Sequence, residues 1–341
     1  MRKIGRPPTI HDVAREAMVS VGTVSHVLNG THRVSDERRQ RVLEAADAIG
    51  YRPNGLARSL RVQRSGVVGL SVPMTSNAYH AGLAEAFEEI AAAAGHVIMQ
   101  VMSRGDPVLE HARIEALLGR QVDGLLVVPS VAPERSLELV ARSHVPAVIV
   151  GRIAETDRFD SISIDDRLAM HAAVRHLRDL GHVRILYMVR NPALLVTRTR
   201  IEALHEVAAG LSVEVAVFGE DRAKLDRELP ARLRAADAPT ALIASNSILA
   251  RWSLYALHRN GLAWPGDVSI ISFDEPVWGE LVTPPLSVVR QPVRQLAREA
   301  WDMLIGRRDG FDGPPRQRLL PVDIVARGST APPSCPHGAP G

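Results

Sequence analysis

A predicted helix near the N-terminus carries polar residues at helical spacing on one of its sides. In "VSVGTVSHVLNG", residues 19–30, spacings of three and four residues place four of them on one face, namely Gly22, Ser25, His26 and Asn29. The opposite face carries Val24, Val27 and Leu28. Small polar side chains on an exposed helix face can hydrogen-bond base edges and phosphates when the helix lies in a major groove. Ordinary short helical hairpins share this pattern, so the surrounding segments must decide between the two interpretations.

Three short helices are expected to position this face. Thr9 can cap a first helix over 10–17, with Asp12 suited to its first turn. Ser20 can cap the second helix, which ends at "NG". A third helix starts at Ser35 and stops at Gly50. Two helices joined by a tight turn and supported by a third predict a helix-turn-helix unit, an all-α head of residues 1–50.

Charge is distributed unevenly along the 341 residues. The first 64 residues hold 12 Lys and Arg against 6 Asp and Glu, whereas the remainder holds 29 against 32. A basic N-terminal module on a slightly acidic body favours a nucleic-acid partner for the head. Arginine richness alone is only composition, because lysine occurs only at Lys3 and Lys224. No apolar run approaches a membrane span and the N-terminus lacks a signal-peptide core, so we expect a cytoplasmic protein.

Motifs for enzymatic chemistry are missing from the sequence. It contains no GxGxxG, GxxxxGK[ST], GxSxG or HExxH, so nucleotide-binding, hydrolase and zincin mechanisms lack their parts. The single cysteine, Cys335, excludes an intrachain disulfide and a cysteine-based zinc site. The histidines are scattered. We therefore expect no catalytic residues, no metal and no cofactor.

Residues 66–330 show the alternation typical of a doubly wound α/β body. Apolar runs such as "VVGLSV", "DGLLVVP", "RILYMV" and "VSIISFD" are separated by helical stretches, which favours parallel strands covered on both faces. The helix ends "AAGHVIM" and "DLGHVRIL" resemble each other, which suggests two similar lobes. Ligands bind at the carboxyl ends of such strands, so two facing lobes predict a cleft.

The head resembles that of the LacI/GalR family of bacterial transcription regulators. The similarity rests on "TIHDVA", "VSVGTVSHVLNG" and "YRPNGLARSL", in this order and spacing. The resemblance implies that the second helix reads bases through Val21, Gly22 and His26, and contacts phosphates through Thr23, Ser25 and Asn29. It also implies a hinge helix that enters the minor groove, with Asn54, Ala57, Arg58 and the wedge residue Leu60.

The body resembles the same family almost to Thr330, with a periplasmic-binding-protein-like fold. Arg200 in "VTRTRIEAL" matches an arginine that hydrogen-bonds ligand oxygens, Asn246 matches the asparagine of an Asn-Asp pair, and Asp274 matches a strand-end aspartate. Further effector contacts are expected from Asn77 and Tyr79 after the first strand, and from Trp278, which can stack on a sugar face. This donor set suits a sugar or sugar derivative.

Each of these residues also has a structural interpretation. Arg200 can pair with Glu202 or Glu206, Asp274 can cap a turn, and Trp278 can belong to the core.

Two positions depart from the family pattern. Met18 occupies the turn where glycine is usual, and a left-handed backbone there costs a side chain about 1–2 kcal/mol. Ser247 stands where aspartate is usual, which removes a carboxylate acceptor from the expected cleft.

Taken with the resemblance, the sequence predicts a homodimeric, effector-responsive repressor of carbohydrate or related catabolic genes that binds a palindromic DNA operator. We expect a head (1–50), a hinge and linker (51–65), a body (66–330) and a disordered tail (331–341). Within the body, the first lobe covers about 66–165 and 291–318, and the second about 166–290 and 319–330. A sugar-binding transport or chemoreceptor component is the alternative, since two-lobed sensors serve both roles. An enzyme built on the same body is a third possibility, and turnover of a bound ligand would reveal it.

Overall fold

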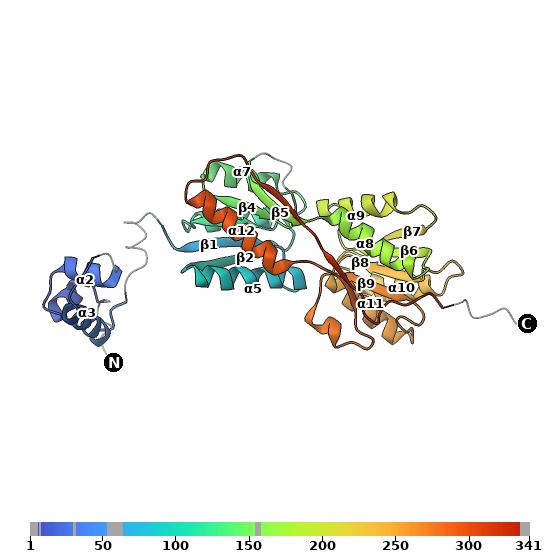
Figure 1. The fold of residues 1–341 in the computed structure, drawn as a ribbon, viewed down its shortest axis with the longest axis horizontal. Coiled ribbons are helices and arrows are strands. Elements are labelled where there is room, and N and C mark those ends of the chain that lie inside the picture. Colours follow the sequence, from blue (N-terminus) through green and yellow to red (C-terminus); the bar gives the residue numbers. More distant parts are fainter. Residues whose placement is uncertain (1–5, 7, 30–31, 53–63, 154–157, 335–341) are drawn as a thin grey trace, which may run out of the picture. The chain divides into compact units, whose positions relative to one another are not determined.

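The computed structural model describes residues 6, 8–29, 32–52, 64–153 and 158–334. The chain forms two compact units, Met1–Ser65 and Gly66–Gly341 (Figure 1). The predicted class, an α/β protein with an all-α head, is confirmed. None of the helices in the described ranges combines the length and apolar character needed to cross a membrane.

The head contains three helices around one small core. They are α1 (Ile10–Glu16), α2 (Val21–Asn29) and α3 (Asp36–Ala48). Helix α1 starts with a capping box, in which Asp12 Oδ2 accepts hydrogen bonds from the backbone N–H of Thr9 at 2.9 Å and from its hydroxyl at 2.7 Å. One residue from each helix is fully buried, namely Val13, Val24 and Val42. All three belong to the core that the three helices share.

The turn between α1 and α2 contains the left-handed backbone conformation that was considered for Met18 from the sequence. Met18 adopts φ 52°, in the left-handed region, and its side chain is 80 % exposed. Because the exposed side chain gains little from packing, the left-handed conformation lowers the stability of the head by about 1–2 kcal/mol.

Two six-stranded sheets form the frame of the body. The first has the order β11-β5-β4-β3-β1-β2 and the second β12-β10-β9-β8-β6-β7. The strands of the first sheet are β1 (Val67–Val72), β2 (Val97–Met102), β3 (Gly124–Val127), β4 (Ala147–Val150), β5 (Asp160–Ile164) and β11 (Gln317–Leu320). Those of the second are β6 (Arg184–Val189), β7 (Ser212–Val217), β8 (Ala241–Ala244), β9 (Ser269–Phe273), β10 (Ser287–Arg290) and β12 (Asp323–Val325). All neighbours pair in parallel except β10 and β12.

Helices cover both faces of each sheet. In the first lobe, α5 (Ala78–Ala93) and α12 (Val293–Arg308) pack together on one face, and α6 (Pro107–Leu118) and α7 (Glu134–Ser143) on the other (Figure 1). In the second, α8 (Asp166–Asp179) and α9 (Leu195–Glu206) pair across the sheet from α10 (Arg222–Leu233) and α11 (Ser247–Arg259). The apolar runs seen in the sequence form the buried strands, as in β3, β4 and β8, where every residue is buried.

The chain passes between the two sheets three times. It leaves the first sheet after β5, returns between β10 and α12, and leaves again between β11 and β12. The expected end of the first lobe at residue 318 falls inside β11, which continues to Leu320.

The start of the expected disordered tail needs correction. The Ala331 carbonyl accepts hydrogen bonds from His182 Nε2 at 2.9 Å and from the Ser269 hydroxyl at 3.0 Å, and the Ser334 hydroxyl donates to the Gly266 carbonyl at 2.6 Å. Residues 331–334 are therefore bound to the second lobe. The sequence offered only a Pro-rich composition there, and composition does not reveal backbone hydrogen bonds.

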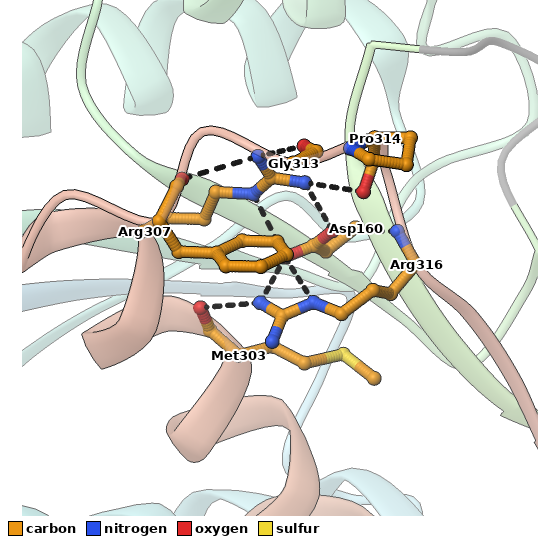
Figure 2. Close-up of polar contacts among 7 residues, drawn as sticks. Asp160, Met303, Arg307, Gly313, Pro314 and Arg316 are labelled. Carbon is orange, nitrogen blue, oxygen red and sulfur yellow. Dashed lines mark hydrogen bonds and ion pairs between the residues drawn. The ribbon is translucent and has the colours of Figure 1, made fainter.

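A buried ionic cluster joins the end of α12 to the start of β5 (Figure 2). The Asp160 side chain is fully buried, and its carboxylate accepts hydrogen bonds from Arg307 Nε (3.1 Å) and Nη2 (2.9 Å). It also accepts from the Arg316 backbone N–H (2.7 Å) and Nη2 (2.5 Å). Burial pushes the pKa of Asp160 upward, but the hydrogen bonds from the two arginines outweigh it, so the pKa lies below its usual value. This cluster holds the segment leading into β11 on the first lobe.

Candidate functional site

The predicted base-reading face lies along α2. Gly22 is exposed, whereas Val21 is half-buried and packs against the head core. Thr23 makes its hydrogen bonds within the head. Its hydroxyl lies 2.9 Å from the Ser20 hydroxyl, and its N–H donates to the same oxygen at 3.1 Å. These contacts cap α2 with Ser20, as the sequence predicted.

The second half of α2 presents the remaining predicted contacts. Ser25 and His26 are half-buried, and the His26 ring meets His32 edge-on, with centroids 4.4 Å apart. Asn29 is the last residue of the helix. The predicted hinge contacts lie outside the described residues, namely Asn54, Ala57, Arg58 and Leu60.

The body has a cavity of about 390 Å³ where the carboxyl ends of strands from both sheets meet. Five of the six predicted effector residues line it, namely Asn77, Tyr79, Arg200, Asn246 and Asp274. Because parallel strands place their following loops at one edge, residues nearly 200 positions apart converge here. The cavity lies within the size range of small-molecule sites.

Asp274 is the polar centre of this cavity. It follows β9 with φ 69°, and its carboxylate accepts hydrogen bonds from Asn77 Nδ2 (3.1 Å), Gln291 Nε2 (2.7 Å) and the Ser247 backbone N–H (3.3 Å). Burial raises the pKa of Asp274, although Arg200 and these donors oppose the rise. The bond from Asn77 joins the first lobe to the second, so this aspartate connects both walls of the cleft.

Arg200 has a partner that neither sequence alternative named. Its Nε donates to Asp166 Oδ1 at 2.6 Å, Nη1 donates to the Ser245 carbonyl at 3.2 Å, and the guanidinium lies 3.9 Å from the centroid of the Phe273 ring. Burial alone would lower the pKa of Arg200, but the nearby Asp166 carboxylate reverses this and the pKa is raised. Arg200 is therefore a fixed, charged donor in the cavity wall.

Glu202 and Glu206 instead pair with residues of α8. Arg167 makes ion pairs with both carboxylates, and His171 Nε2 lies 3.1 Å from Glu206. The structural alternative, in which Arg200 pairs with either glutamate, is therefore wrong. The true partner, Asp166, lies 34 residues away in the sequence, beyond the reach of any local spacing rule.

Two predicted asparagines serve as helix caps as well as cavity residues. Asn246 Oδ1 accepts from the N–H groups of Ile248 and Leu249 at the start of α11, and Asn77 caps α5 in the same way. Tyr79 lies in the first turn of α5, where burial raises the pKa of its hydroxyl and the Asp166 and Asp274 carboxylates raise it further. Its hydroxyl therefore stays protonated and can donate.

Trp278 is placed differently from the expected stacking platform. It lies in a short 3₁₀ helix, Val277–Glu280, is half-buried and packs against the core beneath α10 and α11. It is not among the residues that line the cavity. The structure therefore supports the core interpretation of Trp278.

Sequence reasoning also missed several residues of the cavity. Asp166 and Gln291 are polar partners of Arg200 and Asp274, and Arg190 lines the cavity directly after β6. Their position just beyond strand ends was the available signal. The described residues contain no group of three or more His, Cys, Asp or Glu that could hold a metal.

Ser247 connects the two lobes. Its hydroxyl accepts a hydrogen bond from the N–H of Ala78, the first residue of α5, at 3.3 Å. The residue is 4 % exposed, and its own N–H donates to Asp274. The position thus contributes a bridge between the cleft walls in place of a carboxylate.

Comparisons with known proteins match both units. Residues 9–54 match the bacterial regulatory proteins of the lacI family, and residues 174–330 match the periplasmic binding protein-like domain. The transcriptional regulator DegA of Bacillus subtilis is 31 % identical over 332 residues, which cover 95 % of this chain and 98 % of DegA. The chain belongs to the LacI/GalR family of transcriptional regulators.

Solved structures of LacI/GalR regulators share the fold. The Lac repressor dimer bound to operator and the anti-inducer ONPF superposes with a TM-score of 0.85 at 24 % identity, covering 96 % of this chain and all of the other. The complex of the transcriptional regulator CelR with cellobiose gives a TM-score of 0.70 at 24 % identity, covering 95 % of this chain and 100 % of that one.

Proposed function

We propose that the protein is a cytoplasmic, homodimeric repressor that binds a palindromic operator and responds to a small polyhydroxylated effector. The observation that carries this proposal is the convergence of Asn77, Arg200 and Asp274 on one cavity in a chain that also has a helix-turn-helix head. The relatives are regulators, which favours regulation over catalysis for this chain. Regulated genes of carbohydrate or related catabolism fit the cellobiose bound by the similar regulator CelR.

The head supplies two kinds of DNA contact in this proposal. Val21, Gly22 and His26 meet base edges, while Thr23, Ser25 and Asn29 meet phosphates, which fix the register without reading sequence. Asn54, Ala57 and Arg58 belong to the hinge, and Leu60 enters the minor groove as a wedge that kinks the duplex. A twofold dimer then matches a twofold operator, as in the Lac repressor dimer bound to its operator.

The cleft supplies the regulation. Asn77 and Ala78 of the first lobe hydrogen-bond to Asp274 and Ser247 of the second. A ligand that inserts its own hydroxyl groups among these donors and acceptors binds the two lobe arrangements with different affinity. Only such a difference allows the ligand to shift the equilibrium between the arrangements, and thereby to change operator affinity.

Selection of the purified full-length protein on random duplex DNA, without effector and at near-physiological salt, tests the DNA-binding part. We expect enrichment of one palindrome with a flexible central step, and affinity that falls steeply with salt because phosphate contacts release counterions. Enrichment of no sequence, both without ligand and in the presence of sugars, sugar acids and sugar phosphates, contradicts a sequence-specific repressor.

Leu60→Ala tests the wedge separately. We expect specific binding to weaken more than nonspecific binding, because the unstacked central step exists only in the specific complex. Gel-shift titrations on the selected palindrome and on a scrambled duplex measure both affinities. An equal loss on the two duplexes contradicts the wedge.

A further inference from the structure

Arg190 is a buried cation in the cavity wall with weak protein partners. It directly follows β6, lines the cavity, and has a side chain that is only 11 % exposed. Its Nη1 lies 3.4 Å from Met74 Sδ, and thioether sulfur is a weak acceptor. Its Nε is buried and has no hydrogen-bond partner among the residues that the structure describes.

Within the described ranges, the carboxylate that pairs with Arg190 is that of Glu220, whose side chain is 74 % exposed. An ion pair with an exposed partner contributes little, because water competes for the carboxylate. A guanidinium removed from water needs stronger compensation than this. Burial accordingly lowers the pKa of Arg190.

The other acidic groups of the cavity are already engaged. Asp166 is bound by Arg200, and Asp274 accepts hydrogen bonds from Asn77, Gln291 and the Ser247 N–H. Among the residues that the structure describes, four arginines line the cavity against three carboxylates. The described lining therefore carries an excess of positive charge, although Arg104 is exposed and Arg152 lies near the Glu110 carboxylate, where it opposes the rise in pKa that burial causes.

The neighbouring imidazole adds no second charge. Burial lowers the pKa of His80 to about 4, and the Arg190 cation contributes to the lowering, although the hydrogen bond to the Met74 carbonyl opposes it. His80 is therefore neutral at pH 7, and Arg190 remains the charged donor on this wall.

We propose that the effector carries an acidic group, a carboxylate or a phosphate, and that Arg190 binds it. Guanidinium groups pair with both anions in bidentate geometry. The hydroxyl-binding wall around Arg200, Asn246 and Asp274 holds the rest of the molecule, so the ligand class is sugar acids and sugar phosphates. This inference rests on the proposed function, because it assigns the effector of the same cleft.

Matched compounds test the charge requirement. Calorimetric titrations of the full-length protein would compare glucose, galactose and ribose with gluconate, glucuronate, galactonate, galacturonate, ribonate, glucose 6-phosphate and ribose 5-phosphate. We expect an acid to bind and its neutral parent to bind at least about 30-fold more weakly, the loss expected when a buried charge pair lacks one member. Binding by aldonates and uronates indicates a carboxylate effector, and binding by the phosphates indicates a phosphorylated one.

Variants assign the interaction to Arg190. Arg190→Met should weaken acid binding at least about 30-fold, whereas Arg227→Met, at a 68 % exposed side chain of α10, should leave it unchanged. Glu220→Gln should tighten acid binding, because it removes the anion that competes for Arg190. This second variant keeps the test valid if Arg190→Met fails to fold.

Three results would overturn the proposal: tightest binding of a neutral sugar, no binding of any acid in the panel, or no change of acid affinity in Glu220→Gln. Gel shifts on the selected operator distinguish a failure of the acid site from a failure of the proposed function. Acid binding that leaves operator affinity unchanged refutes the regulation and retains the acid site. Operator binding without acid binding refutes the acid site and retains the proposed repressor.

Discussion

Two buried aspartates lie near opposite ends of β5 and interact with arginine in different ways. Asp160, at the amino end, is held by both Arg307 and Arg316 and has no role in the cavity (Figure 2). Asp166, just past the carboxyl end, pairs with Arg200 at the cavity wall. The residue types are the same, so we propose that the edge of the sheet at which each pair lies determines whether the pair supports the fold or binds a ligand.

The largest expected effect is a loss of stability when the cluster of Asp160 with Arg307 and Arg316 is broken. Asp160→Asn leaves two guanidinium groups without their carboxylate, so we expect the free energy of unfolding to fall by about 3 kcal/mol. Urea denaturation of the full chain measures the loss. Glu138→Gln is the matched control, because its partners Arg142 and Arg158 are exposed and the pairs contribute about 1 kcal/mol or less. Equal losses would remove the distinction between a buried cluster and a surface pair.

The second pair should affect binding more than folding. We expect Arg200→Met to weaken binding of the tightest acid of the panel roughly 30-fold or more, because a charged donor is lost from the wall. The double variant Asp166→Asn/Arg200→Met should recover stability, since no carboxylate is left unpaired, without recovering affinity. Titration calorimetry and urea denaturation of both variants check this. A double variant that binds as tightly as the unmodified protein would place Arg200 among structural residues.

The two aspartates should also differ in their pH dependence. The pKa of Asp160 is lowered on folding, so the unfolded chain takes up its proton first, and the stability from this carboxylate is lost only as pH falls below about 4. Burial raises the pKa of Asp166 despite Arg200, so the folded state takes up that proton first, at higher pH. Urea denaturation between pH 3 and 8 should show the effect of Asp166→Asn changing at higher pH than that of Asp160→Asn. The reverse order would contradict the assigned roles.

The smallest expected effect lies beside the Asp160 cluster. Both guanidinium groups lie over the Phe311 ring, with Arg307 at 4.8 Å and Arg316 at 4.5 Å from its centroid. Phe311 is 43 % exposed, so Phe311→Leu should cost about 0.5–1 kcal/mol. Leu319→Ala, at a 50 % exposed side chain of β11, is the control. Thermal unfolding that shifts equally in both variants would show that the ring contributes only its apolar area.

Local patterns predicted the elements of this protein and much of its cavity. Runs such as β3 and β8 are apolar throughout, which identifies buried parallel strands, and Asp274 was identifiable because it follows β9 directly. Thr9 and Ser20 are the N-cap residues of α1 and α2, and each contacts the residue three positions further along the chain. These features depend on neighbours in the sequence, so the sequence displays them.

Partners across the fold could not be predicted in this way. The pairing of Arg200 with Asp166, and that of Asp160 with Arg307 and Arg316, join positions 34 and about 150 residues apart. Trp278 lies four residues after Asp274 in the sequence, yet this short loop places it against the core of the second lobe and not at the cavity. Which side chains meet depends on how the strands are ordered in the sheet, and spacing along the chain does not contain that order.

The three passages of the chain between the sheets limit how the body can move. A single connection would allow the lobes to rotate and translate relative to each other in any direction. Three connections restrict the translation and favour one rotation. Pro292 and Pro321 lie in two of these passages and fix one backbone torsion in each. We therefore expect the lobes to move relative to each other mainly by rotation, so that compounds that open or close the cleft act along one path.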